Sequence, residues 1–161
     1  MISNGQTKQT NKDGYIKVYF LQSTGEDSYE TETMWCKQVG EYYELANIPI
    51  IVKNLSAGDI ISVEYDEEEN VYYFEDFISF SGNSTVRIHV ENVDDIKPFM
   101  NEFTSMGCDA EGFRAGNILA IHVPKALDYK IIRQHLVNGC NEDKWGFQES
   151  CLSDEHRVQV Q

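Results

Sequence analysis

The sequence has little that would direct the chain into a membrane or out of the cell. Its first residues, MISNGQTKQTNKDG, lack the apolar core of a secretory signal, and no later run reaches the length of a transmembrane helix. The four cysteines, Cys36, Cys108, Cys140 and Cys151, form no C-x-x-C pair and have no histidine at zinc-ligand spacing. We therefore expect a cytoplasmic protein with reduced thiols, no metal and no cofactor.

Positive charge is also scarce. The chain has 27 acidic side chains against 13 Lys and Arg, which gives a formal net charge of −14. Such a chain repels phosphate backbones and anionic lipid, so neither a nucleic acid nor a membrane is expected as a partner. Residues 1–83 carry 15 acidic and 5 basic side chains, and residues 84–161 carry 12 and 8. Most of the net acidity therefore lies in the first half.

Motifs of catalysis and of RNA reading are missing as well. There is no G-x-S-x-G nucleophile elbow, and Cys140 and His135 stand five residues apart, which does not place them on one helix face. A sheet that reads RNA needs aromatic residues for base stacking, and only Phe113 is available on the expected strands. These absences favour a protein that is not an enzyme.

What the first half does contain is a series of strand-like runs. Apolar, aromatic and β-branched residues recur in five segments separated by turns: 15–22, 32–38, 41–47, 60–66 and 71–80. Pro49 makes the intervening NIPII run an edge or a bend. We predict a small barrel-like all-β unit over residues 15–82, preceded by a disordered polar tail over residues 1–14.

The second half changes its period. Thr85 to Val90 alternates apolar and polar residues as a half-buried strand does, and a helical pattern from Ile96 to Met106 follows. Residues 108–114 and 117–124 predict a strand pair, residues 128–137 a second helix that stops at Asn138-Gly139, and residues 145–152 a last strand. The order β-α-β-β-α-β predicts a ferredoxin-like unit over residues 83–153, with a frayed tail over residues 154–161. The whole chain is thus expected to be α+β.

The densest acidic run lies at the tip of the last hairpin of the first unit. An acidic, aromatic-rich surface suits docking to a basic protein, whereas the ordinary explanation of such a run is a solvated turn. The spacing of DEEEN does not fit a calcium loop. The predicted partner-binding residues are Asp66, Glu67, Glu68, Glu69, Tyr72, Tyr73, Glu75 and Asp76.

A second candidate site lies on the second sheet. Arg87 and His89 share the face opposite the helices, and His122 is expected to reach that face from a neighbouring strand, with Arg114 nearby. Two imidazoles and a guanidinium there suit an anion or general acid/base site. The structural alternative is that this face packs against the acidic unit, and it is the favoured one.

The turn SGNST, residues 81–85, joins the two predicted units. It contains an N-x-T sequon and a glycine that suits an anion nest, but no lysine follows and no helix begins there. We interpret it as a structural joint.

Several of these segments together resemble a known family. The stretches TMWCK, ELANIPIIVKNLSAGDIISVE and FISFSGNSTVRI resemble an uncharacterised bacterial family known only as a domain of unknown function, in its E-x-x-W, N-x-P, G-D and S-G-N-S-T-x-R signatures. The resemblance covers about Tyr15 to Leu152 and implies a cytoplasmic bacterial protein without an established activity. The positions it marks are Trp35, Asn47, Pro49, Gly58, Asp59, Ser81, Gly82, Asn83 and Arg87.

The sequence thus leads to two functional hypotheses. The first is an acidic, non-enzymatic protein-binding module, such as an immunity-type inhibitor that blocks the basic active site of a toxin. The second is a sensor or enzyme for a small anion, using Arg87, His89, Arg114 and His122.

Overall fold

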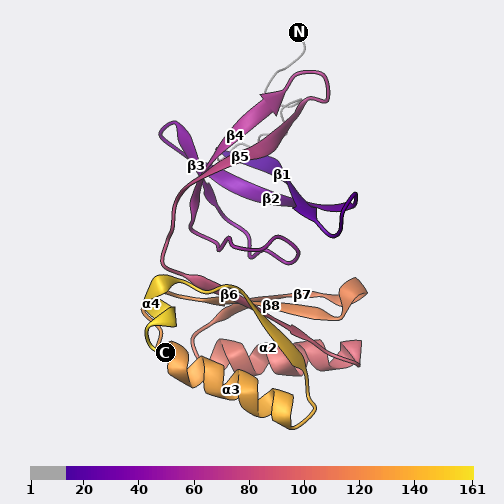
Figure 1. The fold of residues 1–161 in the computed structure, drawn as a ribbon, viewed down its shortest axis with the longest axis vertical. Coiled ribbons are helices and arrows are strands. Elements are labelled where there is room, and N and C mark those ends of the chain that lie inside the picture. The colour runs from indigo at the N-terminus through magenta and orange to yellow at the C-terminus, as the bar shows by residue number, and fades with distance from the viewer. Residues whose placement is uncertain (1–13) are drawn as a thin grey trace.

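Two β-sheets, one from each half of the chain, make up the architecture, which is α+β as the sequence predicts (Figure 1). The computed structural model describes residues 14–161, so the predicted disordered tail falls, apart from Gly14, outside the described residues. The N-terminal sheet lies above one face of the C-terminal sheet, and helices cover the other face of that second sheet (Figure 1). The domain boundaries at residues 15–82 and 83–153 stay predictions.

The N-terminal sheet is a meander of five strands: β1 (Tyr15–Ser23), β2 (Tyr29–Val39), β3 (Tyr42–Leu45), β4 (Ile60–Asp66) and β5 (Val71–Ser79). Each strand pairs antiparallel with the next. β1 also pairs with β5, in parallel, but only at Val18↔Tyr72 and Tyr19↔Tyr73. The sheet therefore closes on itself over two residue pairs only, and it is not a regular barrel.

Alternation along the strands builds the core of this sheet. On β1, Ile16, Val18 and Phe20 are buried while the residues between them are partly exposed, as expected for a strand with one inward face. Met34 and Cys36 of β2 face the same core. Burial raises the pKa of the Cys36 thiol to about 12, so this thiol is protonated and inert at neutral pH.

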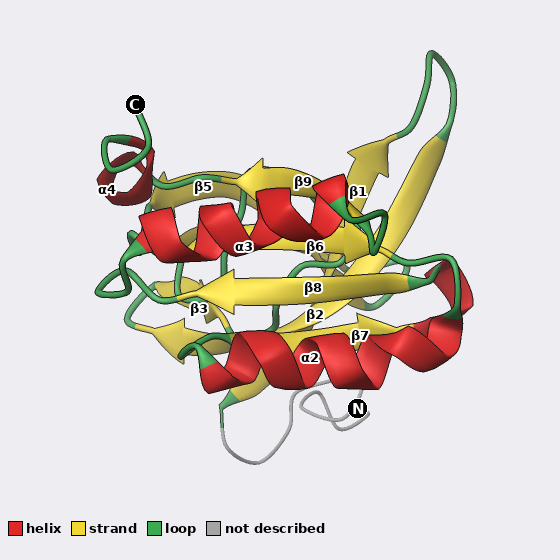
Figure 2. Cartoon of the chain, turned by 90° about the horizontal axis from the view of Figure 1, so that it is seen from below, coloured by secondary structure: helices red, strands yellow, loops and turns green. Residues whose placement is uncertain are grey.

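The C-terminal sheet has the order β7-β8-β6-β9, with every neighbouring pair antiparallel. Its elements follow one another as β6 (Ser84–His89), α2 (Ile96–Ser105), β7 (Asp109–Phe113), β8 (Ile118–Val123), α3 (Tyr129–Asn141) and β9 (Gly146–Cys151). Short 3₁₀ turns, η1 (Val93–Asp95) and η2 (Arg114–Gly116), precede α2 and β8. The two long helices lie side by side on one face of this sheet (Figure 2).

The sequence predicts that the second helix stops at Asn138-Gly139. This expectation is wrong, because α3 continues to Asn141. Gly139 does not end α3; it makes room for the ring of Trp145, whose Nε1 donates to the carbonyl of Leu136 at 3.0 Å. The start of the helix is as expected, since the Asp128 side chain accepts a hydrogen bond from Lys130 N.

The segment from Asp154 onward is ordered, contrary to the frayed tail that its polarity suggests. It forms α4 (Asp154–Arg157), capped by the Ser153 side chain. His156 is completely buried, with its Nδ1 2.6 Å from Ser84 Oγ. The histidine thus fixes the C-terminus against the first strand of the second sheet. No helix in residues 14–161 combines the length and the apolarity needed to cross a membrane.

The contact between Gly139 and Trp145 predicts an unusual glycine substitution. Gly→Ala inside a helix ordinarily stabilises by about 0.5–1 kcal/mol. A Cβ at Gly139 would lie 2.1 Å from the Trp145 ring, so we expect Gly139→Ala to lower the free energy of unfolding by about 1–3 kcal/mol. Urea unfolding followed by circular dichroism measures it. Gly146→Ala is the control, because a Cβ there meets nothing within 4 Å; increased stability of Gly139→Ala would contradict the prediction.

Candidate functional site

Residues 46–59, which connect β3 to β4, fill the space between the two sheets (Figure 1). We call this space the seam. Pro49 is buried there and has no N–H to offer a strand, which keeps the segment out of both sheets. The backbone N–H and C=O groups of this segment therefore need hydrogen-bond partners outside the sheet ladders. Side chains at the seam supply several of these partners.

On the N-terminal side, Glu32 of β2 supplies the acceptor. Its carboxylate accepts hydrogen bonds from Ile50 N at 2.7 Å and from Ile51 N and Val52 N, both at 2.9 Å. Three successive N–H groups on one anion form a concave nest, and hydrogen bonds to a charged group are stronger than neutral ones. The carboxylate therefore fixes the conformation of this segment.

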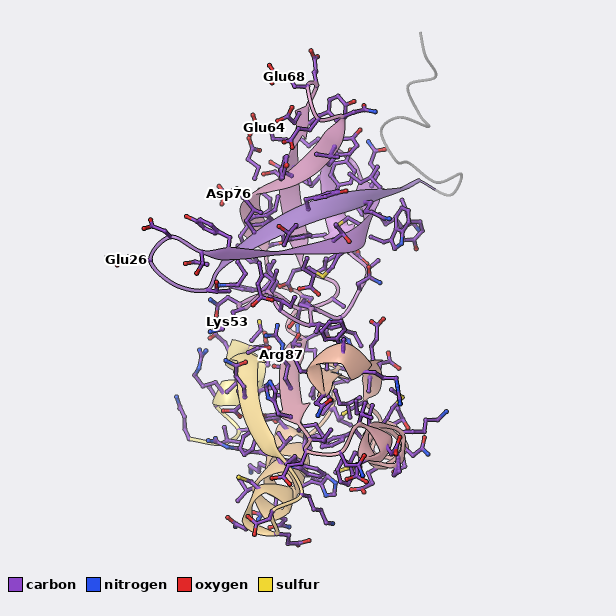
Figure 3. The ribbon with its side chains drawn as sticks, turned by 90° about the vertical axis from the view of Figure 1, so that its right-hand side faces the viewer. Glu26, Lys53, Glu64, Glu68, Asp76 and Arg87 are labelled. Carbon is purple, nitrogen blue, oxygen red and sulfur yellow. The ribbon has the colours of Figure 1, made fainter. Side chains whose placement is uncertain are left out.

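On the opposite side, Arg87 of β6 supplies the donors. Its Nη1 donates to Ile51 O at 3.1 Å, and its Nη2 donates to Val52 O. The side chain is only 4% exposed, and its burial lowers the pKa of the guanidinium while the charge of Glu32 opposes that shift. One short peptide segment thus lies between a carboxylate of one sheet and a guanidinium of the other (Figure 3 labels Arg87).

Asp59 forms a second junction at the seam. Its carboxylate accepts from Ser56 N at 2.9 Å and from both Ser81 N and Ser81 Oγ at 2.8 Å. Burial raises the pKa of Asp59, and these hydrogen bonds oppose the rise. Gly58 beside it has φ +96°, and a Cβ there would lie 3.0 Å from Asn83 Nδ2. Glycine is therefore required for the close approach of the two turns.

The turn at residues 81–85 makes structural contacts with two other segments. Asn83 Nδ2 donates to Ala57 O at 3.0 Å, and Asn83 Oδ1 accepts from Lys125 N at 2.8 Å. The asparagine of the sequon thus ties three segments together. Gly82 has φ +93°, and a Cβ on it would lie 2.6 Å from Lys125 Cδ, so glycine suits this position because of its backbone conformation and the packing of the Lys125 side chain.

His122 lies close to the same seam, near enough for the charge of Asp59 to act on it. It stands opposite Thr85 of β6 and Asp109 of β7, and its Nδ1 is buried without a hydrogen-bond partner among the described residues. Burial lowers the pKa of His122, while the charges of Asp109 and Asp59 oppose the shift. We infer a neutral imidazole at pH 7.

The other two members of the predicted anion site lie elsewhere. His89 is exposed and lines a hollow with Asp143 and Lys144, and Arg114 forms an exposed ion pair with Asp94. Within residues 14–161, no hydrogen bond or ion pair joins Arg87, His89, Arg114 and His122 to one another. The structure therefore does not gather these side chains into one constellation.

The eight predicted partner-binding residues lie at the end of β4, in the turn that follows it and on β5, and we call this stretch the acidic hairpin. Its tip projects away from the C-terminal sheet (Figure 1). Asp66 Oδ1 accepts from Glu68 N and Glu69 N, and Tyr73 Oη donates to Glu69 at 2.8 Å, so the tip is a folded turn. The side chains of Glu67, Glu68, Glu69, Glu75 and Asp76 are exposed.

Nowhere in the described part of the chain do three His, Cys, Asp or Glu side chains cluster as metal ligands would.

Comparison with known proteins places the chain in a family. Residues 32–147 match the model of a family described as a domain of unknown function, DUF4265. The chain belongs to the DUF4265 family. A structure described as a novel crystal structure of a hypothetical protein from Neisseria gonorrhoeae is similar, with a TM-score of 0.70 and 19% identity over 85% of this chain and 94% of that one. At this identity the likeness shows the fold alone. No curated protein matches the sequence.

The positions that the sequence resemblance marks lie largely in and around the seam. Asn47 Oδ1 accepts from Trp35 N at 2.6 Å, and Gly58, Asp59, Ser81, Asn83 and Arg87 make the contacts described above. What the sequence did not reveal is the role of Glu32. It begins the E-x-x-W signature, but nothing local to it indicates that it binds amides some twenty residues later.

The two-sided hold on residues 50–52 predicts coupled substitutions. We expect Glu32→Gln and Arg87→Met each to cost about 1–3 kcal/mol, because each leaves buried backbone groups unpaired. The double variant should cost less than the sum of the two by at least about 0.5 kcal/mol, since both act on one segment. Urea unfolding of the four proteins measures this. Glu30→Gln and Arg114→Met, both at exposed positions, are the matched controls; strict additivity would contradict the shared hold.

His122 predicts a dependence of stability on pH. Its folded-state pKa lies below the ordinary value of 6.5. As the pH falls below that value, the unfolded chain gains a proton that the folded chain does not bind, so stability falls. We expect His122→Gln to lose less stability than the wild type between about pH 7 and pH 5. Urea unfolding across this range tests it, and parallel curves would show that His122 does not contribute.

Proposed function

We propose that this DUF4265 chain is an acidic, non-enzymatic protein-binding module that docks a basic partner through its N-terminal sheet. An immunity-type inhibitor that covers the basic active site of a toxin is the form of this function that we favour. One observation carries the proposal: within residues 14–161, the ion pairs of the protein all lie at Asp94 or beyond, so no exposed carboxylate of the N-terminal sheet is in an ion pair.

The few cations of the N-terminal sheet are engaged with aromatic rings. Lys17 Nζ lies 5.3 Å from the centre of the Trp35 ring, and Lys37 Nζ lies 5.9 Å from that of Tyr15. The exposed carboxylates of this sheet therefore face solvent. Fields of one sign raise association rates with partners of the opposite sign, and this suits a tight inhibitor.

Aromatic rings accompany these carboxylates. The rings of Tyr65 and Tyr72, both on the β4–β5 hairpin that carries the acidic residues, lie 5.0 Å apart. The ring of Tyr73 on the same hairpin lies 5.8 Å from that of Tyr19 on β1. Tyrosines of this kind are enriched in the centres of protein interfaces. Charge and contact area thus lie on one element.

We do not adopt the small-anion alternative. Its central cation, Arg87, is 4% exposed and already donates to two carbonyl groups, so a ligand would have to displace the seam segment. That cost weighs against a sensor or an enzyme built on this residue.

Two finer assignments accompany the proposal. The strand order β7-β8-β6-β9 and the order β-α-β-β-α-β support a ferredoxin-like classification of the second half. The four cysteines are free, which suits a reducing compartment and hence the cytoplasm.

Neutralising the hairpin tip tests the proposed function. We expect Glu67→Gln/Glu68→Gln/Glu69→Gln to weaken binding of the partner captured from the native host by about 5–30-fold at low salt, from three ion pairs of ordinary surface strength. Glu91→Gln/Asp95→Asn/Glu155→Gln removes three exposed carboxylates of the second half and should leave the affinity unchanged. Calorimetric titration gives both numbers.

Co-expression with the product of the adjacent gene tests the immunity form. We expect cells that make a toxic product of the adjacent gene to survive when they also make this protein. They should not survive when they make the hairpin variant instead. Absence of any stoichiometric partner, together with full activity of the neighbouring toxin, would overturn the proposal.

A further inference from the structure

The N-terminal sheet is open along one side. Pairing of β1 with β2 continues to Ser23↔Tyr29, but its pairing with β5 stops at Tyr19↔Tyr73. In the same way β5 remains paired with β4 as far as Ser79. Among the described residues, therefore, β1 from Phe20 and β5 from Phe74 each have a neighbouring strand on one side only.

A groove lies between these two strands. It has a volume of about 340 Å³ and an apolar lining that includes Phe20, Leu21, Leu55, Phe74, Phe77 and Phe80. Leu21 is 59% exposed and Phe80 68%. Exposed apolar side chains that gather in one place, rather than being scattered, are typical of interaction sites.

The walls of the groove favour an extended occupant. A strand with one free side presents unpaired N–H and C=O groups, which is the template for β-strand addition. The floor is the seam segment, held to β1 by a hydrogen bond from Lys53 N to Gln22 Oε1 at 3.0 Å. A peptide lying here would find main-chain partners at its sides and aromatic rings beneath alternate side chains.

The charge around the groove selects the chemistry of that peptide. Glu75 and Asp76 are exposed on the β5 side, and Glu26 and Asp27 are exposed at the β1–β2 turn. Glu26 and Asp76 lie toward the same side of the N-terminal sheet, with Lys53 below them (Figure 3). Among the described residues, Lys53 is the one charged residue in the lining of the groove, and four exposed carboxylates lie around it. This balance of charge and the mostly apolar lining suit a segment that alternates apolar and basic residues.

We propose that the gap between β1 and β5 binds an extended, basic and apolar peptide segment of a partner protein, which adds to the sheet as a further strand. This inference rests on the proposed function for the basic character of the partner. It adds the place and the mode of recognition.

Synthetic peptides test the groove directly. The probe is an acetylated peptide of about seven residues, the length of an ordinary strand, that alternates lysine and valine. Saturable binding measured by fluorescence anisotropy, with amide NMR shifts at residues 20–23 and 74–80, is expected. Peptides that alternate glutamate and valine, or that place the valines in one block, should bind at least about tenfold more weakly. No binding of the lysine–valine peptide, or equal binding of all three, would overturn the proposal.

Strand addition has its own control. Two versions of the peptide carry N-methyl groups at alternate residues, one version for each edge. At least one should lose binding, because methylation removes the N–H groups that bond to the sheet. Undiminished binding of both would rule out strand addition.

Groove variants locate the site. Leu21→Lys/Phe80→Lys should weaken binding of the lysine–valine peptide at least about tenfold. The double variant places positive charge, like that of the peptide, at two exposed positions of the groove. Val39→Lys/Val158→Lys changes two exposed apolar residues away from the groove and should have no effect. Equal effects of the two variants would place the peptide elsewhere.

Two other occupants would also overturn the proposal. A wild type that is dimeric by sedimentation, with a monomeric groove variant, would make the groove an interface between copies of this chain. Peptide binding that appears only after deletion of residues 1–13 would make that segment the occupant.

The outcomes separate this inference from the proposed function. A captured partner whose affinity responds to the hairpin variant but not to the groove variant would overturn the groove alone. Peptide binding without any protein partner would support the groove and overturn the docking module.

Discussion

The hold on residues 50–52 is the interaction on which the rest of the structure depends. These residues belong to no sheet, so their amide and carbonyl groups would be unpaired in a buried place without help, at a cost of about 1–3 kcal/mol each. Glu32 binds the amides and Arg87 binds the carbonyls. Because the two side chains come from different sheets, one segment both satisfies its own backbone and joins the halves of the molecule.

Charge is used differently in the two halves. From Asp94 onward, acidic residues lie beside basic ones, as in the pair of Arg133 with Glu149 at 3.7 Å. In the N-terminal sheet, Lys17 and Lys37 lie over aromatic rings, and within residues 14–161 no carboxylate there has an ion pair. A sheet kept acidic repels itself, which costs stability. In the proposed function, a basic partner would offset this repulsion when it docks.

The order of elements could be predicted from the sequence, because alternation and helical period are local signals. The burial of Val86 and Ile88 follows from such alternation. Contacts made across long separations could not be predicted. Gly139 looks like a helix stop until the ring of Trp145 is placed against it, and the polar tail looks frayed until His156 is found buried. At the seam, the sequence predicts that the face carrying Arg87 packs against the acidic unit, but it does not predict that Arg87 bonds to carbonyl groups with Glu32 on their far side.

Val52 connects the seam to the groove. Its N–H donates to Glu32, its carbonyl accepts from Arg87, and its side chain lies 6% exposed among the residues that line the gap between β1 and β5. The floor of the groove is therefore fixed by the same bonds that join the sheets. Because the floor is fixed before binding, the protein does not have to order this segment when a peptide docks, and such preorganisation raises affinity. The signature that gathers at the seam, although it looks like folding information, thus also shapes the surface on which recognition would take place.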